Sequence, residues 1–171
     1  EISTRDWSSD VCSSDLVRCA VRLVVGSQDT IVPPSTDVPM YGNLRGPSQL
    51  VTIVGGSHCG FIDSAIAFCD SGTLTRTQQL AIVRREVAEF LVLYLRGDAA
   101  QWGAVWDAPP ADAGITQQSR QTPDLDGNGR VDGSDLGILL SNFGQPGRGD
   151  VNGDGTVDGA DLGALLAAWT G

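Results

Sequence analysis

Residues 124–143 read DLDGNGRVDGSDLGILLSNF, and residues 150–169 read DVNGDGTVDGADLGALLAAW. The second segment repeats the first at a spacing of 26 residues, and 11 of the 20 aligned positions are identical. A repeat this short holds one supersecondary unit, so the duplication predicts two copies of the same local structure. We therefore expect the C-terminal part of the chain to fold as a tandem pair.

Each copy opens with a twelve-residue loop that follows the pattern D-x-[DN]-x-[DN]-G, five further residues and an acid. Ca²⁺ takes six to eight oxygen ligands, and alternate residues of a tight loop can all direct oxygens inward. The ligands expected in the first loop are Asp124, Asp126, Asn128, the carbonyl of Arg130, Asp132 (directly or through water) and Asp135. Those expected in the second loop are Asp150, Asn152, Asp154, the carbonyl of Thr156, Asp158 and Asp161. The pattern predicts two calcium ions.

A single amphipathic helix is expected after each loop, and no apolar helical segment precedes either one. The apolar positions of the two helices are Leu136, Leu139, Leu140 and Phe143, and Leu162, Leu165, Leu166 and Trp169. This loop-then-helix duplicate, with Asp in the twelfth position, resembles a type I dockerin module over Asp124 to Trp169. The resemblance implies a small all-α, calcium-binding domain over residues 124–171.

Dockerins are non-catalytic modules of secreted bacterial proteins, and they bind cohesins on scaffold proteins or cell surfaces. The resemblance thus implies a cohesin-type protein partner and a secreted or cell-surface location. The tenth and eleventh loop positions, where the family commonly carries hydroxyl or small aliphatic residues, hold Gly133-Ser134 and Gly159-Ala160. These glycines weaken the expectation of a standard cohesin partner.

Upstream of the repeats, residues 108–123 (APPADAGITQQSRQTP) contain three prolines and few large apolar residues. Such a composition is typical of a solvated tether between separately folding parts. We expect a linker here.

Two short apolar runs in residues 17–107, Val21 to Val25 and Leu50 to Val54, each stop at glycine and suit strands of a parallel sheet. Apolar residues at three-and-four spacing then predict a long helix from about residue 75 to Arg96, with Gly97 as its C-cap. The order of strand, crossover, strand and helix predicts an α/β region.

Two residues that could perform chemistry follow these strands. Asp29 comes just after the first, and His58, the one histidine, comes just after the second. The carboxyl ends of parallel strands meet at one edge of a sheet, where ligands bind. A carboxylate on one imidazole nitrogen leaves the other free to accept a proton from a nucleophile. Asp37 and Asp63 are the alternative acids.

This region, from about Val21 to about Trp106, resembles the C-terminal part of an α/β-hydrolase of the serine-esterase kind, which includes dienelactone-hydrolase-like, chlorophyllase-like and cutinase-like enzymes. The resemblance rests on GSQDTIVPP around Asp29 and on GGSHCGF around His58. It implies that Asp29 is the catalytic acid and His58 the base. No G-x-S-x-G motif occurs in the chain. We therefore expect a truncated C-terminal part of the α/β-hydrolase sheet, with nucleophile and oxyanion hole upstream, and no activity on the ester substrate of the intact parent.

The same region contains three cysteines, Cys19, Cys59 and Cys69. Cys59 and Cys69 could close a loop behind His58 as a disulfide, or remain buried thiols. Export of the protein favours the disulfide.

The N-terminal segment, residues 1–16, reads EISTRDWSSDVCSSDL and shows no apolar periodicity. Back-translated, Asp6 to Leu16 resembles a widely used sequencing-library adapter, so we expect an artefact of disordered character and exclude the segment from fold reasoning.

The net charge of −10 is regional: −3 in residues 1–16, −1 in residues 17–107 and −6 in residues 108–171. The eleven basic residues are all arginine and form no stripe, which argues against nucleic-acid binding. No apolar run reaches the roughly 18 residues needed to span a bilayer. Two functions remain as hypotheses: the C-terminal fragment of a secreted serine esterase with a tethering module, or a non-catalytic calcium-binding, cohesin-interacting module as the one working unit.

Overall fold

The computed structural model describes residues 19–171 except 45, 65–66, 108 and 127–128. The expected artefact over residues 1–16 and the expected ligand Asn128 lie outside the described residues. The elements in chain order are β1 (Val21–Gly26), α2 (Pro34–Asn43), β2 (Ser48–Ile53), the 3₁₀ turn η2 (His58–Phe61), α3 (Arg76–Arg96), the 3₁₀ turn η3 (Ala99–Gln101), α4 (Trp102–Trp106), β3 (Ile115–Arg120), α5 (Gly133–Ser141) and α6 (Gly159–Ala167).

The two apolar runs do form neighbouring parallel strands. β1 pairs with β2 in a register that runs from Val21 opposite Ser48 to Gly26 opposite Ile53. Val51 and Ile53 of β2 are fully buried, which explains the near-continuous apolar pattern of that strand. These two strands and the helix that ends at Gly97 confirm the corresponding expectations.

A third strand corrects the expected fold class. β3 pairs antiparallel with β2, from Ile53 opposite Ile115 to Ser48 opposite Arg120, so the sheet is small and mixed, in the order β1-β2-β3. The described residues form this sheet and five α-helices, with 41% helix and 12% strand. The prediction of a truncated α/β-hydrolase sheet plus an all-α domain is wrong, because residues 115–120, expected to be part of a linker, complete the sheet.

The polar sequence of β3, ITQQSR, concealed this strand. Only Ile115 enters the apolar core, where it packs with Val51 and Ile53. The remaining residues are held by polar contacts instead: Gln117 Nε2 donates to the carbonyl of Val105 at 3.2 Å, and Arg120 donates to the carbonyl of Leu44 at 2.7 Å. An edge strand needs one buried apolar residue and a partner, so apolar periodicity does not reveal it.

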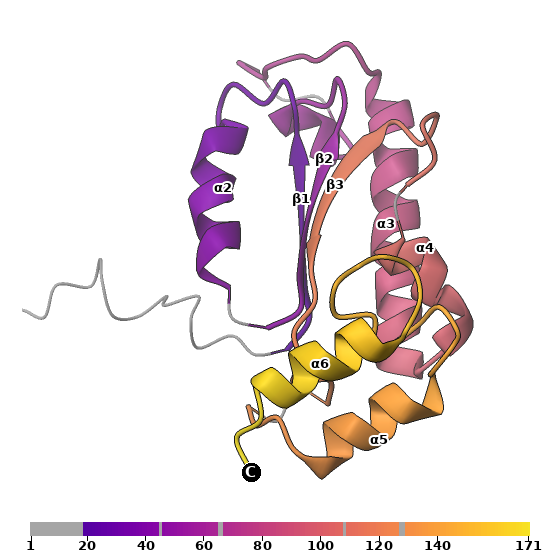
Figure 1. Cartoon of the computed structure of the whole chain (residues 1–171). Coiled ribbons are helices and arrows are strands. Elements are labelled where there is room, and N and C mark those ends of the chain that lie inside the picture. The colour runs from indigo at the N-terminus through magenta and orange to yellow at the C-terminus, as the bar shows by residue number, and fades with distance from the viewer. Residues whose placement is uncertain (1–18, 45, 65–66, 108, 127–128) are drawn as a thin grey trace, which may run out of the picture.

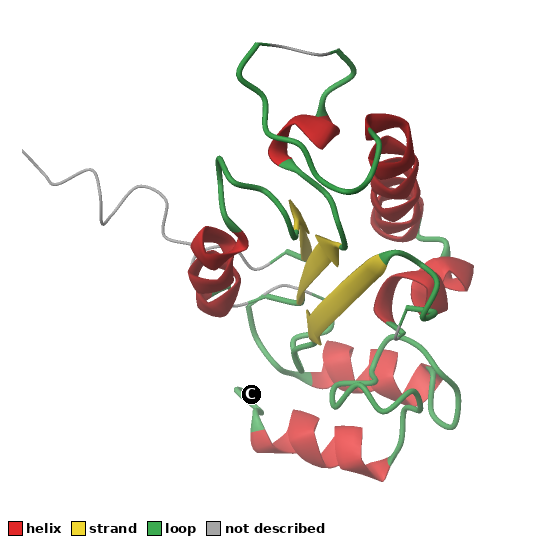
Figure 2. Cartoon of the chain, turned by 90° about the horizontal axis from the view of Figure 1, so that it is seen from above, coloured by secondary structure: helices red, strands yellow, loops and turns green. Residues whose placement is uncertain are grey.

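Helices cover both faces of the sheet. Figures 1 and 2 show α2 on one face and α3 with α4 on the other. α3 begins at a capping box in which Thr75 and Gln78 satisfy each other's backbone N–H groups, and it ends at Gly97, whose φ of 66° is left-handed. Its buried Glu86 meets Arg22 of β1 at 2.9 Å, which fixes the helix to the sheet.

The two repeats share one small core. It consists of five buried side chains: Leu125, Val131, Leu139, Val157 and Leu165. Four of them are equivalent residues of the two copies, since Val131 matches Val157 and Leu139 matches Leu165. The first copy supplies three of these side chains and the second copy supplies two, so neither copy has a complete core without the other.

The repeats lie against the end of the α/β region (Figure 1). A cavity between them is lined by Tyr94, Trp102 and Trp106 on one side and by residues of the first loop, including Asp124 and Asp126, on the other. Within the part of the chain that the structure describes, no helix has the length and apolar character needed to cross a membrane.

Candidate functional site

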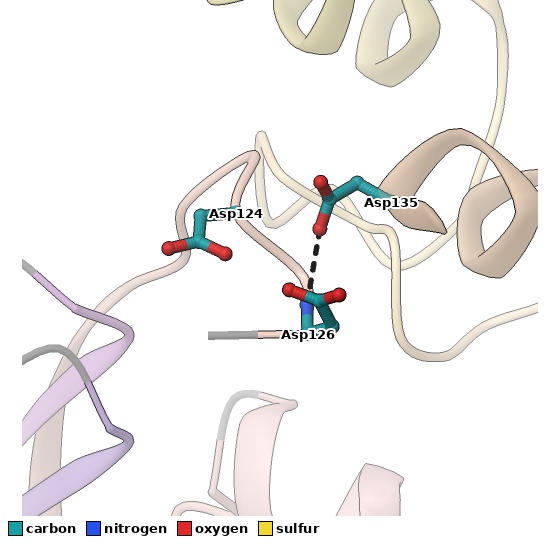
Figure 3. Close-up of side chains that lie close together, drawn as sticks. All are labelled: Asp124, Asp126 and Asp135. Carbon is teal, nitrogen blue, oxygen red and sulfur yellow. Dashed lines mark hydrogen bonds between the residues drawn. The ribbon is translucent and has the colours of Figure 1, made fainter. Parts of the chain in front are cut away.

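The first repeat gathers three carboxylates around one point. Oxygens of Asp124, Asp126 and Asp135 lie within 4.8 Å of one another, and Figure 3 shows them facing a common space from the loop and from the start of α5. Asp135 is completely buried, and Oδ1 of Asp124 is buried as well. Three negative charges this close repel one another unless a cation lies between them.

Backbone hydrogen bonds fix the loop around these groups. Asp135 Oδ1 accepts from the N–H groups of Leu125 at 2.6 Å and Asp126 at 3.0 Å, and Oδ2 accepts from Asp132 at 2.8 Å. The last residue of the loop is thereby tied to its first turn. Asp135 thus acts as a structural residue of the loop as well as a candidate ligand.

The second repeat reproduces this network. Asp161 Oδ1 accepts from Val151 at 2.7 Å and Asn152 at 3.0 Å, while Oδ2 accepts from Asp158 at 2.9 Å. Asp161 is completely buried, and Asp150 is 4% exposed. The same contacts at positions 26 residues apart show that the described residues of the two loops are held in the same way.

The glycine in the sixth position of each loop makes a sharp turn possible. Gly129 and Gly155 have φ angles of 87° and 95°, which residues with a Cβ rarely adopt. Their N–H groups donate at 2.8 Å to Oδ2 of Asp124 and Asp150, the first residues of the loops. The turn therefore directs the chain back over the carboxylate that opens each loop.

Two further predicted ligands occupy equivalent places in the two loops. Asp132 and Asp158 are the N-caps of α5 and α6, and their side chains accept from Ser134 and Ala160. In the second loop, Asp154 accepts the N–H of Thr156 at 3.0 Å. In the first loop, the guanidinium of Arg130 donates to the carbonyl of Gly171, which leaves the Arg130 side chain outside the loop. The donor set is made of oxygen atoms, which fits a hard divalent cation.

A second candidate site lies where β1 and β2 end. Asp29 Oδ2 lies 3.0 Å from His58 Nδ1, with the carboxylate side chain 7% exposed and the imidazole 43% exposed. Asp29 Oδ1 accepts the N–H groups of Ile31 and Val32, at 2.9 and 2.6 Å. The structure therefore brings the predicted acid and base together, with the acid fixed by its own turn and the base open to solvent.

The two alternative acids are elsewhere. Asp63 is an exposed residue that forms an ion pair with Arg84 at 3.5 Å. Burial raises the pKa of Asp37, and the negative charge of Asp29 raises it further. Asp37 is thus near the site but is not the group that holds the imidazole.

One residue of this site escaped the sequence reasoning. Asp70 accepts the N–H groups of Thr30, His58 and Cys59, at 3.0, 3.0 and 2.9 Å. Burial raises the pKa of Asp70, but the three N–H donors and the His58 imidazole together lower it below its ordinary value. No sequence pattern marks Asp70, because it reaches the site only through the closure of the preceding loop.

That closure is a disulfide. Cys59 and Cys69 are bonded, with their Cα atoms 5.7 Å apart, which confirms the favoured pairing, and Cys19 is an exposed free thiol. The bridge joins the residue after His58 to the residue before Asp70.

No protein-family model, curated protein or solved structure matches the chain, so the two sites are interpreted from their geometry.

Proposed function

We propose that residues 124–171 bind two calcium ions and that this binding completes their fold. The observation that carries the proposal is the repeated loop network: buried Asp135 and Asp161 accept equivalent backbone N–H groups in the two loops, and in the first loop Asp124, Asp126 and Asp135 gather around one space. Calcium suits such loops better than magnesium, since Mg²⁺ demands near-ideal octahedral geometry and retains its water. The groups that would hold the ions are the two sets of loop oxygens named from the sequence.

Calorimetric titration of the full chain with CaCl₂ tests this proposal. We expect two sites per chain, one of which is lost in Asp135→Ala and the other in Asp161→Ala. Asp112→Ala, which removes an exposed acid outside the loops, is the matched control and retains both sites. Absence of heat in the wild-type chain, or an unchanged stoichiometry in both loop variants, would contradict the proposal.

We further propose that this module tethers the protein to a cohesin-type partner outside the cell. Large apolar side chains are exposed at equivalent positions of the two repeats: Leu140 matches Leu166, and Phe143 matches Trp169. Paired exposed apolar residues on two helices and on the segments that directly follow them favour a protein partner. Calorimetry with a purified cohesin domain should show binding in calcium and none in EGTA. A Leu140→Asp/Leu166→Asp variant that still binds the cohesin would contradict the use of this surface.

A second candidate function rests on the 3.0 Å contact between Asp29 and His58. We propose that these residues are the orienting acid and the base of a secreted serine-type carboxylic ester hydrolase. A proton on Nδ1, held by Asp29, leaves Nε2 as the proton acceptor, and the carboxylate stabilises the imidazolium that forms. The chain contains no G-x-S-x-G motif, so the proposal assigns the base and the acid alone.

The single histidine makes this proposal testable without a substrate. Long-range ¹H–¹⁵N spectra of labelled full-length chain report which imidazole nitrogen carries the proton. We expect the Nδ1–H tautomer in the wild type and a gain of Nε2–H in Asp29→Ala. Ester hydrolysis by the chain should be silent, and activity that disappears in His58→Ala would reveal a nucleophile within the chain.

A further inference from the structure

Asp70 connects two turns that are distant in sequence. Its Oδ2 accepts both Thr30 N–H and His58 N–H, and its Oδ1 accepts Cys59 N–H. Thr30 directly follows Asp29, and His58 is itself the base, so one carboxylate holds the backbone beside both members of the pair. A carboxylate that accepts several backbone N–H groups forms strong, charge-assisted hydrogen bonds.

Among the described residues, the other backbone N–H groups that donate from one turn to the other lie at the base of the turns. Gln28 N–H donates to the Gly56 carbonyl at 2.8 Å, and Gly55 N–H donates to Ser27 Oγ at 2.8 Å. These bonds align the strand ends, but they precede Asp29 and His58 in both turns. Thr30 follows Asp29 at the outer end of its turn, and its N–H donates to Asp70 Oδ2 at 3.0 Å.

The disulfide determines where Asp70 lies. Cys69 precedes Asp70, and its partner Cys59 is one of the three residues whose N–H groups Asp70 accepts. The bridge closes a separation of 10 residues and so restricts the position of the carboxylate before any hydrogen bond forms. Arg76 Nε also approaches the Cys59 carbonyl, at 3.5 Å, which adds a contact from the start of α3.

We propose that Asp70 is a positioning residue for the Asp29–His58 pair and that the Cys59–Cys69 disulfide holds it in place. The inference rests on the proposed role of that pair as acid and base. The role of Asp70 is to keep the imidazole of His58 in the orientation in which Nδ1 faces Asp29. The hydrogen bonds that Asp70 accepts from Thr30, His58 and Cys59 are called the clamp. A hydrogen bond of 3.0 Å between the side chains of Asp29 and His58 tolerates little movement of either turn, so loss of the clamp weakens it.

The imidazole tautomer of His58 in the full chain tests the proposal at about pH 9, well above the ordinary pKa of histidine. We expect the ratio of Nδ1–H to Nε2–H to fall about fivefold in Asp70→Ala, the change that corresponds to one net hydrogen bond. Asp70→Asn, whose amide oxygen can still accept N–H groups, should restore part of the ratio. An unchanged ratio in both variants overturns the proposal.

Asp63→Ala is the matched control, because Asp63 lies within the same disulfide loop and its side chain is 86% exposed. The control should keep the wild-type ratio, and a fall equal to that in Asp70→Ala would show a nonspecific effect of the loop charge and overturn the assignment. Reduction of the disulfide, or Cys69→Ser, should shift the ratio in the same direction as Asp70→Ala. An unchanged ratio after reduction overturns the part assigned to the disulfide.

Amide hydrogen exchange tests the Asp70 hydrogen bonds separately from the acid–base role of the Asp29–His58 pair. In Asp70→Ala the amides of Thr30, His58 and Cys59 should exchange faster, while those of β1 and β2 keep their protection and show that the variant is folded. If the wild-type histidine carries its proton on Nε2, the proposed acid–base function fails, whatever the amides show. If the tautomer is Nδ1–H and the three amides exchange at wild-type rates in Asp70→Ala, the positioning role fails alone.

Discussion

The α/β region and the repeats bury charge in different ways. In the α/β region, Arg22 and Glu86 are paired at 2.9 Å with side-chain exposures of 2% and 4%, and Arg85 adds a second bond to the same carboxylate. In the repeats, Asp135 and Asp161 are completely buried among backbone N–H donors, and Asp135 also has the carboxylates of Asp124 and Asp126 beside it. In the α/β region, the negative charge of Glu86 is therefore balanced by arginines of the same region. The repeats gather negative charge, which an added cation would balance.

Removal of calcium should produce the largest difference between the regions. Each site adds about 4 kcal/mol to the free energy of unfolding when free calcium is a thousand times its dissociation constant. With excess EGTA we expect the helices α5 and α6 to lose protection and the strands β1 and β2 to keep it. Peptide-resolved hydrogen exchange measures both regions in one experiment.

The emission of Trp102 and Trp106 gives an independent readout of the same change. Both residues line the cavity opposite Asp124 and Asp126, so loosening of the first loop should expose them and shift their emission to the red. Asp112→Ala should respond to EGTA as the wild type does. Protection that stays equal in the two regions after chelation would remove the proposed contrast.

Replacement of Glu86 by Ala should give the second largest effect, now confined to the α/β region. It leaves Arg22 buried without its carboxylate, a loss that typically costs about 3–5 kcal/mol. Burial already lowers the pKa of Arg22, a sign that its surroundings disfavour the charge, and the Glu86 carboxylate opposes that shift. Urea denaturation in saturating calcium measures the loss, which should not depend on the calcium concentration.

The double variant Arg22→Met/Glu86→Leu is the control for this prediction. It removes both charges and fills their volume with apolar atoms, so it should recover most of the stability. A double variant as unstable as Glu86→Ala would mean that packing around these residues, and not the unpaired charge, causes the loss.

Sequence patterns predicted those parts of the fold that depend on periodicity. Val51 and Ile53 are buried by strand pairing, and Gly97 ends α3 in the left-handed conformation, as the apolar runs and the glycine indicated. β3 could not be predicted in this way. Its stability comes from pairing with β2 and from two polar side chains: Gln117 bonds to Val105, 12 residues away, and Arg120 bonds to Tyr41, 79 residues away.

The candidate sites show the same division. The loop carboxylates and Asp29 follow local patterns, and the structure brings Asp29 to His58 and gathers Asp124, Asp126 and Asp135. Asp70 carries no local pattern, since its place depends on a disulfide that joins residues 59 and 69. Whether the chain forms two separately folding parts, as the composition shift near residue 108 indicated, stays a prediction.

Helix caps sharpen the comparison at a smaller energy. Thr75 caps α3 through its side chain, as Asp158 caps α6. Thr75→Ala should lower the free energy of unfolding of the α/β region by about 1 kcal/mol with or without calcium, and Thr75→Ser should restore it. Asp158→Ala should cost little in EGTA, where α6 has already lost its protection, and more in calcium, where it removes both the cap and a proposed ligand. An equal cost of Asp158→Ala in both conditions would show that Asp158 is a cap alone.

The smallest expected effect is a pH dependence that belongs to the α/β region. The native pKa of Asp70 lies below its unfolded value, so the ionised carboxylate stabilises the native state above the unfolded pKa of about 4. This stabilisation is lost as pH falls through the native pKa. Among the described residues, His58 is the titratable group whose charge acts on Asp70, Arg76 at the start of α3 lines the same cavity, and Asp29 contacts the far side of the His58 imidazole.

Urea denaturation of the wild type and Asp70→Asn at a series of pH values, with calcium absent throughout, measures this term. Asp70→Asn should be less stable than the wild type at pH 6. The difference should begin to shrink below about pH 4, where the carboxylate of the unfolded chain takes up its proton, and should close once the pH has fallen through the lower native pKa of Asp70. The size is modest because Asp70 is partly exposed to solvent, which screens its charge. Removing calcium isolates the term, since protons also compete with calcium for the loop carboxylates. A stability difference that persists unchanged to pH 2 would show that Asp70 acts through hydrogen-bond geometry alone, which the neutral acid retains, and that its charge contributes nothing to the clamp.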